Sequence, residues 1–368
     1  MTAEVEFIAS VVPAGPGPAE APAAPRDADY PIRVAAAVSE AGFDKLLVGY
    51  APRAPDGLLV ASLVLTTSAS LGVVVTQVPG LVAPTVAARQ YATLAAFHRD
   101  RVAMHVIIHD EAGEAGPGAP DGDDCDPAAK PRRAAEFLEV VRLAWSSAGA
   151  FTYSGEFYQV SDAWAAIRPA RGRLPVYFAG VSGEAIRVGA RHADVYSFWG
   201  EPLAGIRELI GRVRAASADA GRAIRDFCVS LRPIAADTET AAWQRARDLL
   251  ELARDQASAR GAPSPPMQAE GARRLLRYAA RADLHDKRLW TAMSVVTGAP
   301  GNSTALVGSY EQVAESLLDY VSAGASGLLI RGYDPLADAT AYGRLIRLVH
   351  DKVGDDLDGY RARVRPAA

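Results

Sequence analysis

Eight short runs of apolar and β-branched residues, each bounded by turn residues, constrain the fold of this chain more than any other feature. They are, in order, Val5–Val12, Lys45–Tyr50, Gly72–Val78, Arg101–His109, Pro175–Ala179, Ala193–Phe198, Phe227–Ala235 and Ser326–Arg331. Runs of this length and composition predict buried β-strands. Because they are apolar along most of their length, we expect a sheet that is covered on both faces.

Amphipathic segments, with apolar residues at three- and four-residue spacing, separate these strands and predict helices. They are Tyr30–Gly42, Gly57–Thr67, Pro84–Phe97, Pro131–Ser146, Glu184–Ala190, Leu203–Ala220, Glu239–Arg260, Tyr310–Ala323 and Leu336–Val353. Strands that alternate with helices indicate an α/β protein with a parallel sheet. Eight such units in 368 residues fit a (β/α)8 TIM barrel with insertions.

Two stretches break the alternation, and we interpret them as insertions in a single domain of residues 1–368. Residues 111–129 are rich in Gly, Pro and Asp, which predicts a long loop after the fourth strand. Residues 257–287 are polar and Arg-rich, and we expect a mobile segment there that is partly helical, from Gln268 to Arg281. Residues 151–160 carry two aromatic runs around Ser154 and Gly155, which predict a β-hairpin.

Composition excludes several classes of protein. A net charge of −4 gives no basic excess for binding nucleic acid. The N-terminus has no positively charged segment before its apolar run, and no uncharged stretch is long enough for a membrane span, so we expect a cytoplasmic protein. Cys125 and Cys228 are too few for a disulfide scaffold or a Cys-rich zinc site. Only four of the 39 basic residues are Lys, which suggests a GC-rich, actinobacterial gene.

Several catalytic motifs are missing from the chain. No GxGxxG follows the first strand, and no GxxxxGK[ST], HExxH or GxSxG occurs. His105 and His109 are four apart on a predicted strand, where that spacing puts both on one face, beside Asp110 and Glu111. A metal site is one interpretation. We favour the other, in which His105 is a hydrogen-bonded residue inside the barrel, and we predict no metal site.

In a barrel, the chemistry lies at the C-terminal ends of the strands. This rule selects candidate residues without reference to any motif. In chain order they include Tyr50, Thr76, Gln77, His109, Gly180, Val181, Ser182, Trp199, Ser230, Arg232 and Tyr333. A mouth that combines Trp, Tyr, Arg and His with small residues suits a planar, anionic ligand.

Five separate blocks carry a resemblance to a known family. They are Ala83–Leu94, Val176–Ser182, Asp194–Pro202, Thr304–Gly308 and Gly327–Tyr333. In these blocks the chain resembles the bacterial-luciferase-like flavin-dependent monooxygenases, and among them most closely the alkanesulfonate monooxygenases. The blocks follow the family's order, and the resemblance extends from Glu6 to about Val353. The family fold is a TIM barrel, as the strand count also predicts.

The resemblance implies an activity and its partners. Family members take reduced FMN (FMNH2) from a separate NAD(P)H:flavin reductase and react it with dioxygen to form a flavin peroxide. That oxidant then attacks a small organic substrate, here an organosulfur compound or a specialised metabolite. Members form dimers or tetramers, so a homo-oligomer is expected.

The resemblance also assigns roles to residues of this chain. Ser182 would contact the flavin phosphate at a helix N-terminus, where Gly180 lets the backbone approach closely and Val181, between them, is also a cofactor-binding candidate. Thr76 and Gln77 would touch the flavin ring, and His109 and Lys130 complete the predicted cofactor site. Trp199, Arg232 and Tyr333 are the catalytic candidates. The segment 257–287 resembles the family's active-site lid. The residues expected to line the substrate side or this lid are Tyr50, Ser230, Thr297, Arg277 and Arg281. Arg277 and Arg281 lie one helical turn apart.

The departures from the alkanesulfonate pattern concern the substrate. Ala54 replaces a Cys after strand two, and Thr297 replaces a lid Arg. On strand seven, Ser230 and Arg232 replace an Arg and a His, and Pro131 aligns with a Tyr that contacts phosphate. We therefore expect that alkanesulfonates are not the substrate. Two alternatives stay open: an oxidoreductase dependent on the deazaflavin F420, and a homologue that has lost flavin catalysis.

Overall fold

The computed structural model describes residues 4–11, 29–51, 54–99, 101–108, 126, 128–259, 269–299, 302–354 and 357–364. Three sequence-based predictions fall on residues outside these ranges. They are the cofactor role of His109, the loop at residues 111–125, and the middle of the proposed lid at residues 260–268.

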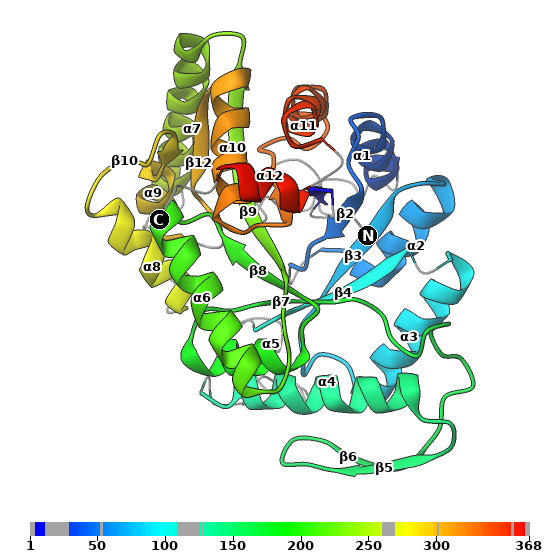
Figure 1. Ribbon diagram of the computed structural model, residues 1–368. Coiled ribbons are helices and arrows are strands. Elements are labelled where there is room, and N and C mark those ends of the chain that lie inside the picture. Colours follow the sequence, from blue (N-terminus) through cyan, green and yellow to red (C-terminus); the bar gives the residue numbers. More distant parts are fainter. Residues whose placement is uncertain are drawn as a thin grey trace.

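Eight parallel strands close into a barrel, as the sequence predicts (Figure 1). They are β1 (Glu6–Val11), β2 (Lys45–Val48), β3 (Gly72–Gln77), β4 (Val102–Ile107), β7 (Val176–Ala179), β8 (Val195–Trp199), β9 (Asp226–Ala236) and β13 (Gly327–Ile330). Each pairs with the next, and β13 pairs with β1 in the register Glu6 with Gly327, which closes the sheet. The sequence-based expectation of a TIM barrel is confirmed.

Helices surround this barrel (Figure 1). They are α1 (Asp29–Glu40), α2 (Gly57–Thr67), α3 (Pro84–Phe97), α4 (Lys130–Ser146), α5 (Gly183–His192), α6 (Leu203–Asp219), α7 (Glu239–Ala259), α8 (Glu270–Ala279), α9 (Ala292–Thr297), α10 (Tyr310–Ala323), α11 (Ala339–Val353) and α12 (Leu357–Val364). The predicted hairpin is also present, as β5 (Phe151–Ser154) and β6 (Gln159–Ala163).

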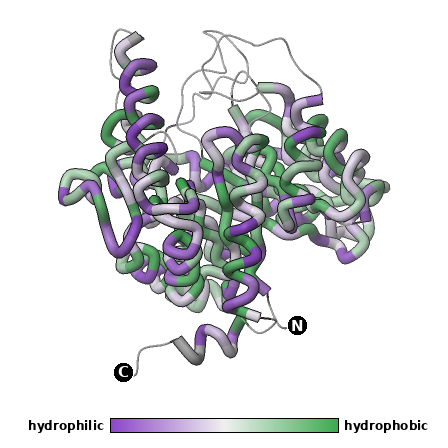
Figure 2. Tube along the Cα trace, turned by 90° about the horizontal axis from the view of Figure 1, so that it is seen from above, coloured by the Kyte–Doolittle hydropathy of each residue, from purple (hydrophilic) through white to green (hydrophobic). Residues whose placement is uncertain are grey.

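Alternate residues of each barrel strand face opposite sides, and this divides the core in two. The larger apolar cluster lies between the strands and the helices. A smaller cluster lies inside the barrel, and its buried members are Ile8, Leu47, Val74, Ala103, Tyr177, Cys228 and Leu329. In Figure 2 hydrophobic and hydrophilic residues alternate along the outer helices. The inner cluster identifies which residues of each strand point to the barrel axis.

Sequence analysis missed a second sheet segment that extends from the barrel. Strand β9 is 11 residues long, and its final residues, from Arg232 to Ala236, pair with β12 (Ala305–Ser309) beyond the barrel wall. The short strands β11 (Leu289–Trp290) and β10 (Leu284–His285) continue this sheet. Figure 1 shows β9 and β12 rising beside α7. The extension forms one side of the barrel mouth.

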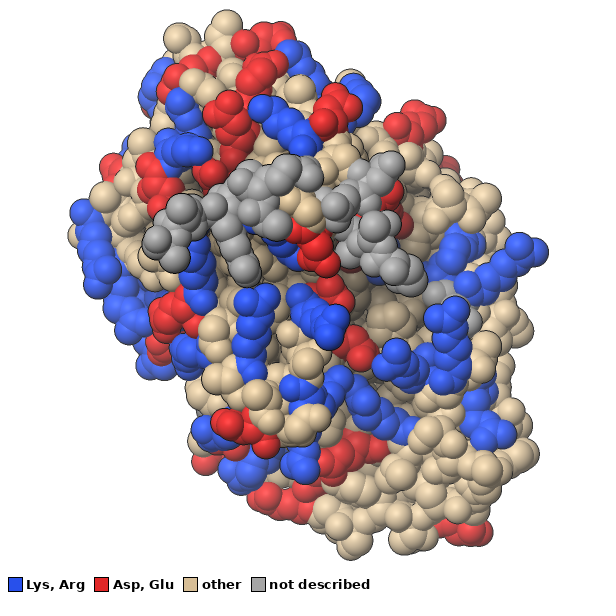
Figure 3. Space-filling model, in the orientation of Figure 1, with Lys and Arg blue, Asp and Glu red and all other residues tan. Residues whose placement is uncertain are grey.

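Two surface observations complete the fold. On the face shown in Figure 3, Lys and Arg side chains are interspersed with Asp and Glu. None of the helices in the described ranges is long and apolar enough to span a bilayer.

Candidate active site

The barrel interior changes from apolar to polar at the C-terminal ends of the strands. Two residues beyond the inner apolar cluster, the same strand faces carry polar side chains. These are Ser10, Thr76, His105, Ser197, Ser230 and Arg331. Most of them are buried. Within this layer the ring nitrogens of His105 are buried without a partner among the described residues, which is uncommon in a purely structural core. This layer is therefore the first candidate for a binding site.

His105 lies in this layer on β4 and is 8% exposed. Both ring nitrogens are buried and have no hydrogen-bond partner among the described residues. The expected position inside the barrel is confirmed, but the expected hydrogen bond is absent. Burial, together with the charge of Arg331, lowers the pKa of His105 to about 4. The ring is therefore neutral at pH 7, with one donor and one acceptor nitrogen to offer.

Two arginines lie side by side at this end of the barrel, Arg331 within the polar layer and Arg232 two residues beyond Ser230 on β9. Ile330 pairs with Leu231, and the Arg331 amide continues the ladder with a 2.9 Å hydrogen bond to the Leu231 carbonyl. Arg331 and Arg232 are thus neighbours on adjacent strands. Burial, reinforced by the charge of Arg232, lowers the pKa of Arg331 to about 9. Arg331 still carries its charge at neutral pH.

Arg232 is held rigidly by its surroundings. Its Nε donates to the Asn302 carbonyl at 2.7 Å, and Nη1 donates to the Gly332 carbonyl at 3.1 Å. Its guanidinium also lies 5.3 Å from the centre of the Tyr333 ring. The Tyr333 hydroxyl is buried without a partner among the described residues, and burial raises its pKa. The hydroxyl therefore keeps its proton at neutral pH and can donate it.

A buried polar network fixes the neighbouring wall. Asn302 donates from Nδ2 to the Ser230 carbonyl at 2.7 Å and contacts the Ser230 hydroxyl at 3.3 Å. Thr304 donates to the Gly200 carbonyl at 2.6 Å. Sequence analysis missed Asn302, because an Asn in a Gly- and Pro-containing segment is typical of a turn.

Trp199 ends β8 next to Ser230, with which it is in register. The helix α8 closes over it at very short range, because a Cβ built at Gly271 would lie 2.9 Å from the indole ring. This helix is anchored by Arg274, which makes two 2.7 Å hydrogen bonds to the buried carboxylate of Glu201. Arg274 also bonds to Glu208 at 3.0 Å.

The structure therefore singles out Arg274 in the Arg-rich run of the proposed lid. Arg277 is exposed and pairs with Glu270 at 2.9 Å. Arg281 is also exposed, with its guanidinium 5.9 Å from the centre of the Tyr278 ring. Of the Arg residues in this run, Arg274 is the one that reaches the barrel mouth, through Glu201.

The turn between β7 and α5 has the features of an anion site. Gly180 has a φ of +154°, and a Cβ added there would lie 2.7 Å from the Ala185 Cβ. Ser182 is the N-cap of α5, and its hydroxyl oxygen accepts from the Ala185 amide at 3.2 Å. The first amides of any helix have no intrahelical acceptor and attract anions. Glu184, in this first turn, is paired with Arg187 at 2.9 Å.

A small cavity lies beside the ends of β3 and β4. It is lined by Val78, Pro79, Ile107, Ile108, Lys130, Arg133 and Ala134. Lys130 is buried here, at the start of α4. Thr76 faces the barrel axis, whereas Gln77 alternates to the other face of β3, where its Nε2 donates to the Val78 carbonyl at 3.1 Å.

The remaining predicted residues lie further from this group or make local contacts. Tyr50 follows β2 and is half-buried. Thr297 ends α9, and its hydroxyl donates within that helix to the Met293 carbonyl at 2.9 Å. Among the described residues, no group of His, Cys, Asp and Glu side chains is arranged to hold a metal ion.

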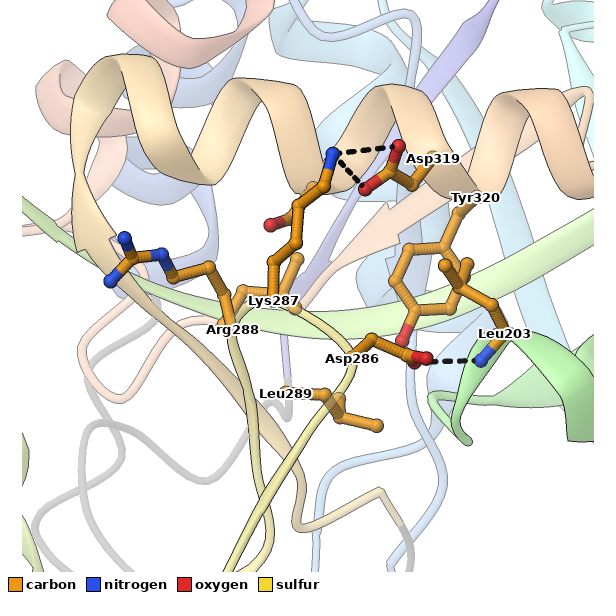
Figure 4. A pocket seen from close by; sticks show the side chains of 9 residues that line it. Leu203, Asp286, Lys287, Arg288, Leu289, Asp319 and Tyr320 are labelled. Carbon is orange, nitrogen blue, oxygen red and sulfur yellow. Dashed lines mark hydrogen bonds and ion pairs between the residues drawn. The ribbon is translucent and has the colours of Figure 1, made fainter.

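A second depression is occupied by paired charges (Figure 4). It lies between the start of α6, the β10–β11 hairpin and α10. Lys287 contacts Asp319 at 2.9 Å, and the Asp286 carboxylate accepts from the Leu203 amide at 2.8 Å. Because these groups satisfy one another, this depression is a structural junction.

The barrel and its polar mouth match a known family. Residues 7–327 match the model of the luciferase-like monooxygenases, and the chain belongs to this family. The match describes the whole family and does not single out the alkanesulfonate monooxygenases. The chain is therefore an enzyme of an oxidoreductase family.

Solved structures with the same fold differ in their named activities. The riboflavin lyase RcaE, solved with modified FMN and riboflavin, is 18% identical with a TM-score of 0.74, covering 97% of this chain and 93% of its own. The EDTA monooxygenase EmoA from Chelativorans sp. BNC1 is 17% identical with a TM-score of 0.75, covering 98% of each chain. An F420-dependent secondary alcohol dehydrogenase is 15% identical with a TM-score of 0.70, covering 95% of this chain and 99% of its own. At these identities the similarity establishes the fold alone.

Proposed function

We propose that the protein is a two-component monooxygenase that binds reduced FMN at the barrel mouth and oxidises a small organic substrate with dioxygen. The observation that carries this proposal is the turn at Gly180. The backbone there passes the start of α5 too closely for a side chain, and it leaves the first amides of the helix open to an anion. Ser182, Gly183 and Glu184 would hold the cofactor phosphate there.

The rest of the mouth fits the cofactor as well. The His105 ring nitrogens and the Tyr333 hydroxyl are buried and have no partner among the described residues, so each can form a hydrogen bond to a ligand. Thr76 and the cavity at Lys130 lie at the ends of β3 and β4, where the ring would bind. Reduced flavin supplies the electrons with which dioxygen is activated. The chain itself binds and orients the reactants, and Tyr333 Oη holds a proton beside them.

Exclusion of water is the second task of the chain. Trp199 is covered by α8, and the Arg274–Glu201 ion pair holds that helix in place. A closed, dry mouth protects a reactive oxidant from unproductive decay. We propose that α8 is the fixed part of the lid that the sequence predicts between residues 257 and 287.

Two neighbouring glycines provide a test of the cofactor site. In Gly180→Ala the new Cβ clashes with Ala185, whereas a Cβ at Gly183 would meet only Arg187 Nη1 at 3.8 Å. We expect Gly180→Ala to weaken anaerobic binding of reduced FMN at least tenfold and Gly183→Ala to leave it almost unchanged. Binding of reduced riboflavin, which lacks the phosphate, should differ little between the two variants. Equal effects on reduced FMN would place the phosphate elsewhere.

An F420-dependent oxidoreductase is the alternative, because the same barrel serves an F420-dependent alcohol dehydrogenase. It would transfer a hydride and use no dioxygen. We also propose that simple alkanesulfonates are not substrates, which a sulfite-release assay with a flavin reductase would test. The homo-oligomer, the reductase partner, the cytoplasmic location and the actinobacterial origin stay predictions.

A further inference from the structure

Arg331 and Arg232 form a pair of cations that the described residues do not neutralise. They are neighbours at the ends of β13 and β9, on the strand faces that carry the interior residues Leu329 and Ser230. No ion pair joins either arginine to a carboxylate within the described ranges. Two like charges held together in a half-buried place are unfavourable unless an anion lies between or beside them.

Asp338, a carboxylate that lies against the segment after β13, is already engaged. Asp338 is 3% exposed and forms an ion pair with Arg245. It also accepts hydrogen bonds from the backbone amides of Tyr333 and Asp334 and from the Tyr342 hydroxyl. The Asp338 carboxylate therefore stabilises the segment after β13. It forms its ion pair with Arg245, so Arg331 has no counter-ion among the described residues.

His105 is an independent sign that a ligand belongs at this level. In the order of strands around the barrel, β4 lies opposite β13. His105 and Arg331 each lie two residues beyond a member of the inner apolar cluster, Ala103 and Leu329, so both side chains face the barrel axis at the same level. His105 is only 8% exposed, and neither ring nitrogen has a partner in the described structure. An imidazole ring and a guanidinium group thus face the axis at one level, with the Arg232 guanidinium on the adjacent strand.

We propose that the substrate carries a carboxylate, and that Arg331 binds it end-on with help from Arg232 and His105. The fork of Arg331, like the His105 ring, makes no hydrogen bond to the described residues, and a planar fork matches a planar carboxylate. Nε and Nη1 of Arg232 donate to backbone carbonyls, so Nη2 is the group that can donate to a ligand. The phosphate of the cofactor is assigned to the turn after β7, on another part of the rim.

This inference rests on the proposed function in one respect: the anion bound by Arg331 is taken to be the substrate of the enzyme. Its test therefore uses the protein without flavin. Benzoate, benzamide and benzenesulfonate are titrated into the wild-type protein, into Arg331→Gln and into Arg173→Gln, with calorimetry and melting temperature as readouts. Arg173 is a matched control, because it is 72% exposed and precedes β7 at the opposite end of the barrel.

We expect benzoate to bind and stabilise the wild type and Arg173→Gln, and benzamide to do neither. Arg331→Gln should lose about 10- to 100-fold in benzoate affinity. Without ligand it should melt no lower than the wild type, because an unneutralised charge has been removed. Absence of benzoate binding to the wild type would overturn the inference, whether or not the variant folds, and leave the flavin proposal untouched.

Two other results would also overturn it. Stronger binding of benzenesulfonate than of benzoate would assign the pair to a sulfonate. If Arg331→Gln kept its benzoate affinity and lost affinity for reduced FMN, Arg331 would serve the cofactor instead of the substrate.

Discussion

Arg274→Met is the perturbation whose consequences the structure defines best. Arg274 Nε and Nη2 each donate to the Glu201 carboxylate at 2.7 Å, and the side chains are 9% and 3% exposed. Removing the arginine leaves a buried carboxylate without its partner. Such losses cost about 3–5 kcal/mol. The second contact, to the half-exposed Glu208, adds at most about 1 kcal/mol.

The free energy of unfolding, from urea denaturation, should therefore fall by about 4 kcal/mol in Arg274→Met. A second variant, Arg274→Met with Glu201→Gln, removes the buried charge, and its cost should fall to about 1–2 kcal/mol. Arg277→Gln on the same helix is the control. Its ion pair with Glu270 is exposed, so the change should stay below about 1 kcal/mol.

A loss below about 1 kcal/mol in Arg274→Met would refute this reasoning, because α8 would then not depend on its buried anchor. So would a double variant that is no more stable than the single one, since the cost would not come from the unpaired carboxylate. Fluorescence of Trp199 offers a second readout, because α8 packs against this ring at Gly271.

Three further predictions follow from single residues. His105 has a pKa of about 4 in the folded protein against 6.5 in the unfolded chain, so acid protonates the unfolded state first. Of the stability lost between pH 6.5 and pH 4 in a series of urea titrations, about 3 kcal/mol should come from His105 and be absent from His105→Gln. Burial raises the pKa of the Cys228 thiol to about 12. In a Cys125→Ser background, iodoacetamide should therefore label Cys228 only after unfolding. Labelling of the native protein would contradict the burial of this thiol. Glu136 accepts from the amides of Glu156, Phe157 and Tyr158, so Glu136→Ala should expose the β5–β6 turn to proteolysis and cost about 2 kcal/mol, whereas an unchanged digestion pattern would show that the hairpin holds without it.

The sequence predicts the barrel well because its signals are local. The run from Gly72 to Val78 is apolar and bounded by turn residues, and it forms β3 from Gly72 to Gln77. The pair Ser182 and Gly183 likewise marks the start of α5 by cap chemistry alone. Such features depend on neighbours along the chain.

The parts of the site that sequence analysis missed depend on distant neighbours. Glu201 and Arg274 are 73 residues apart, and only the fold shows that they form a buried pair. Asn302 meets Ser230 across 72 residues of chain. Arg331 ends a predicted strand, yet the absence of a carboxylate beside it becomes visible only when β9 and β13 are paired.

The affinity of the protein for reduced FMN relative to F420 tests the central claim most directly. It is measured anaerobically, by titration of the flavin-free protein with reduced FMN and then with F420 as a competitor. The account predicts saturable binding of reduced FMN that F420 displaces poorly, followed by flavin reoxidation at a rate set by the protein when dioxygen is admitted. Tight binding of F420 with no binding of reduced FMN would contradict it.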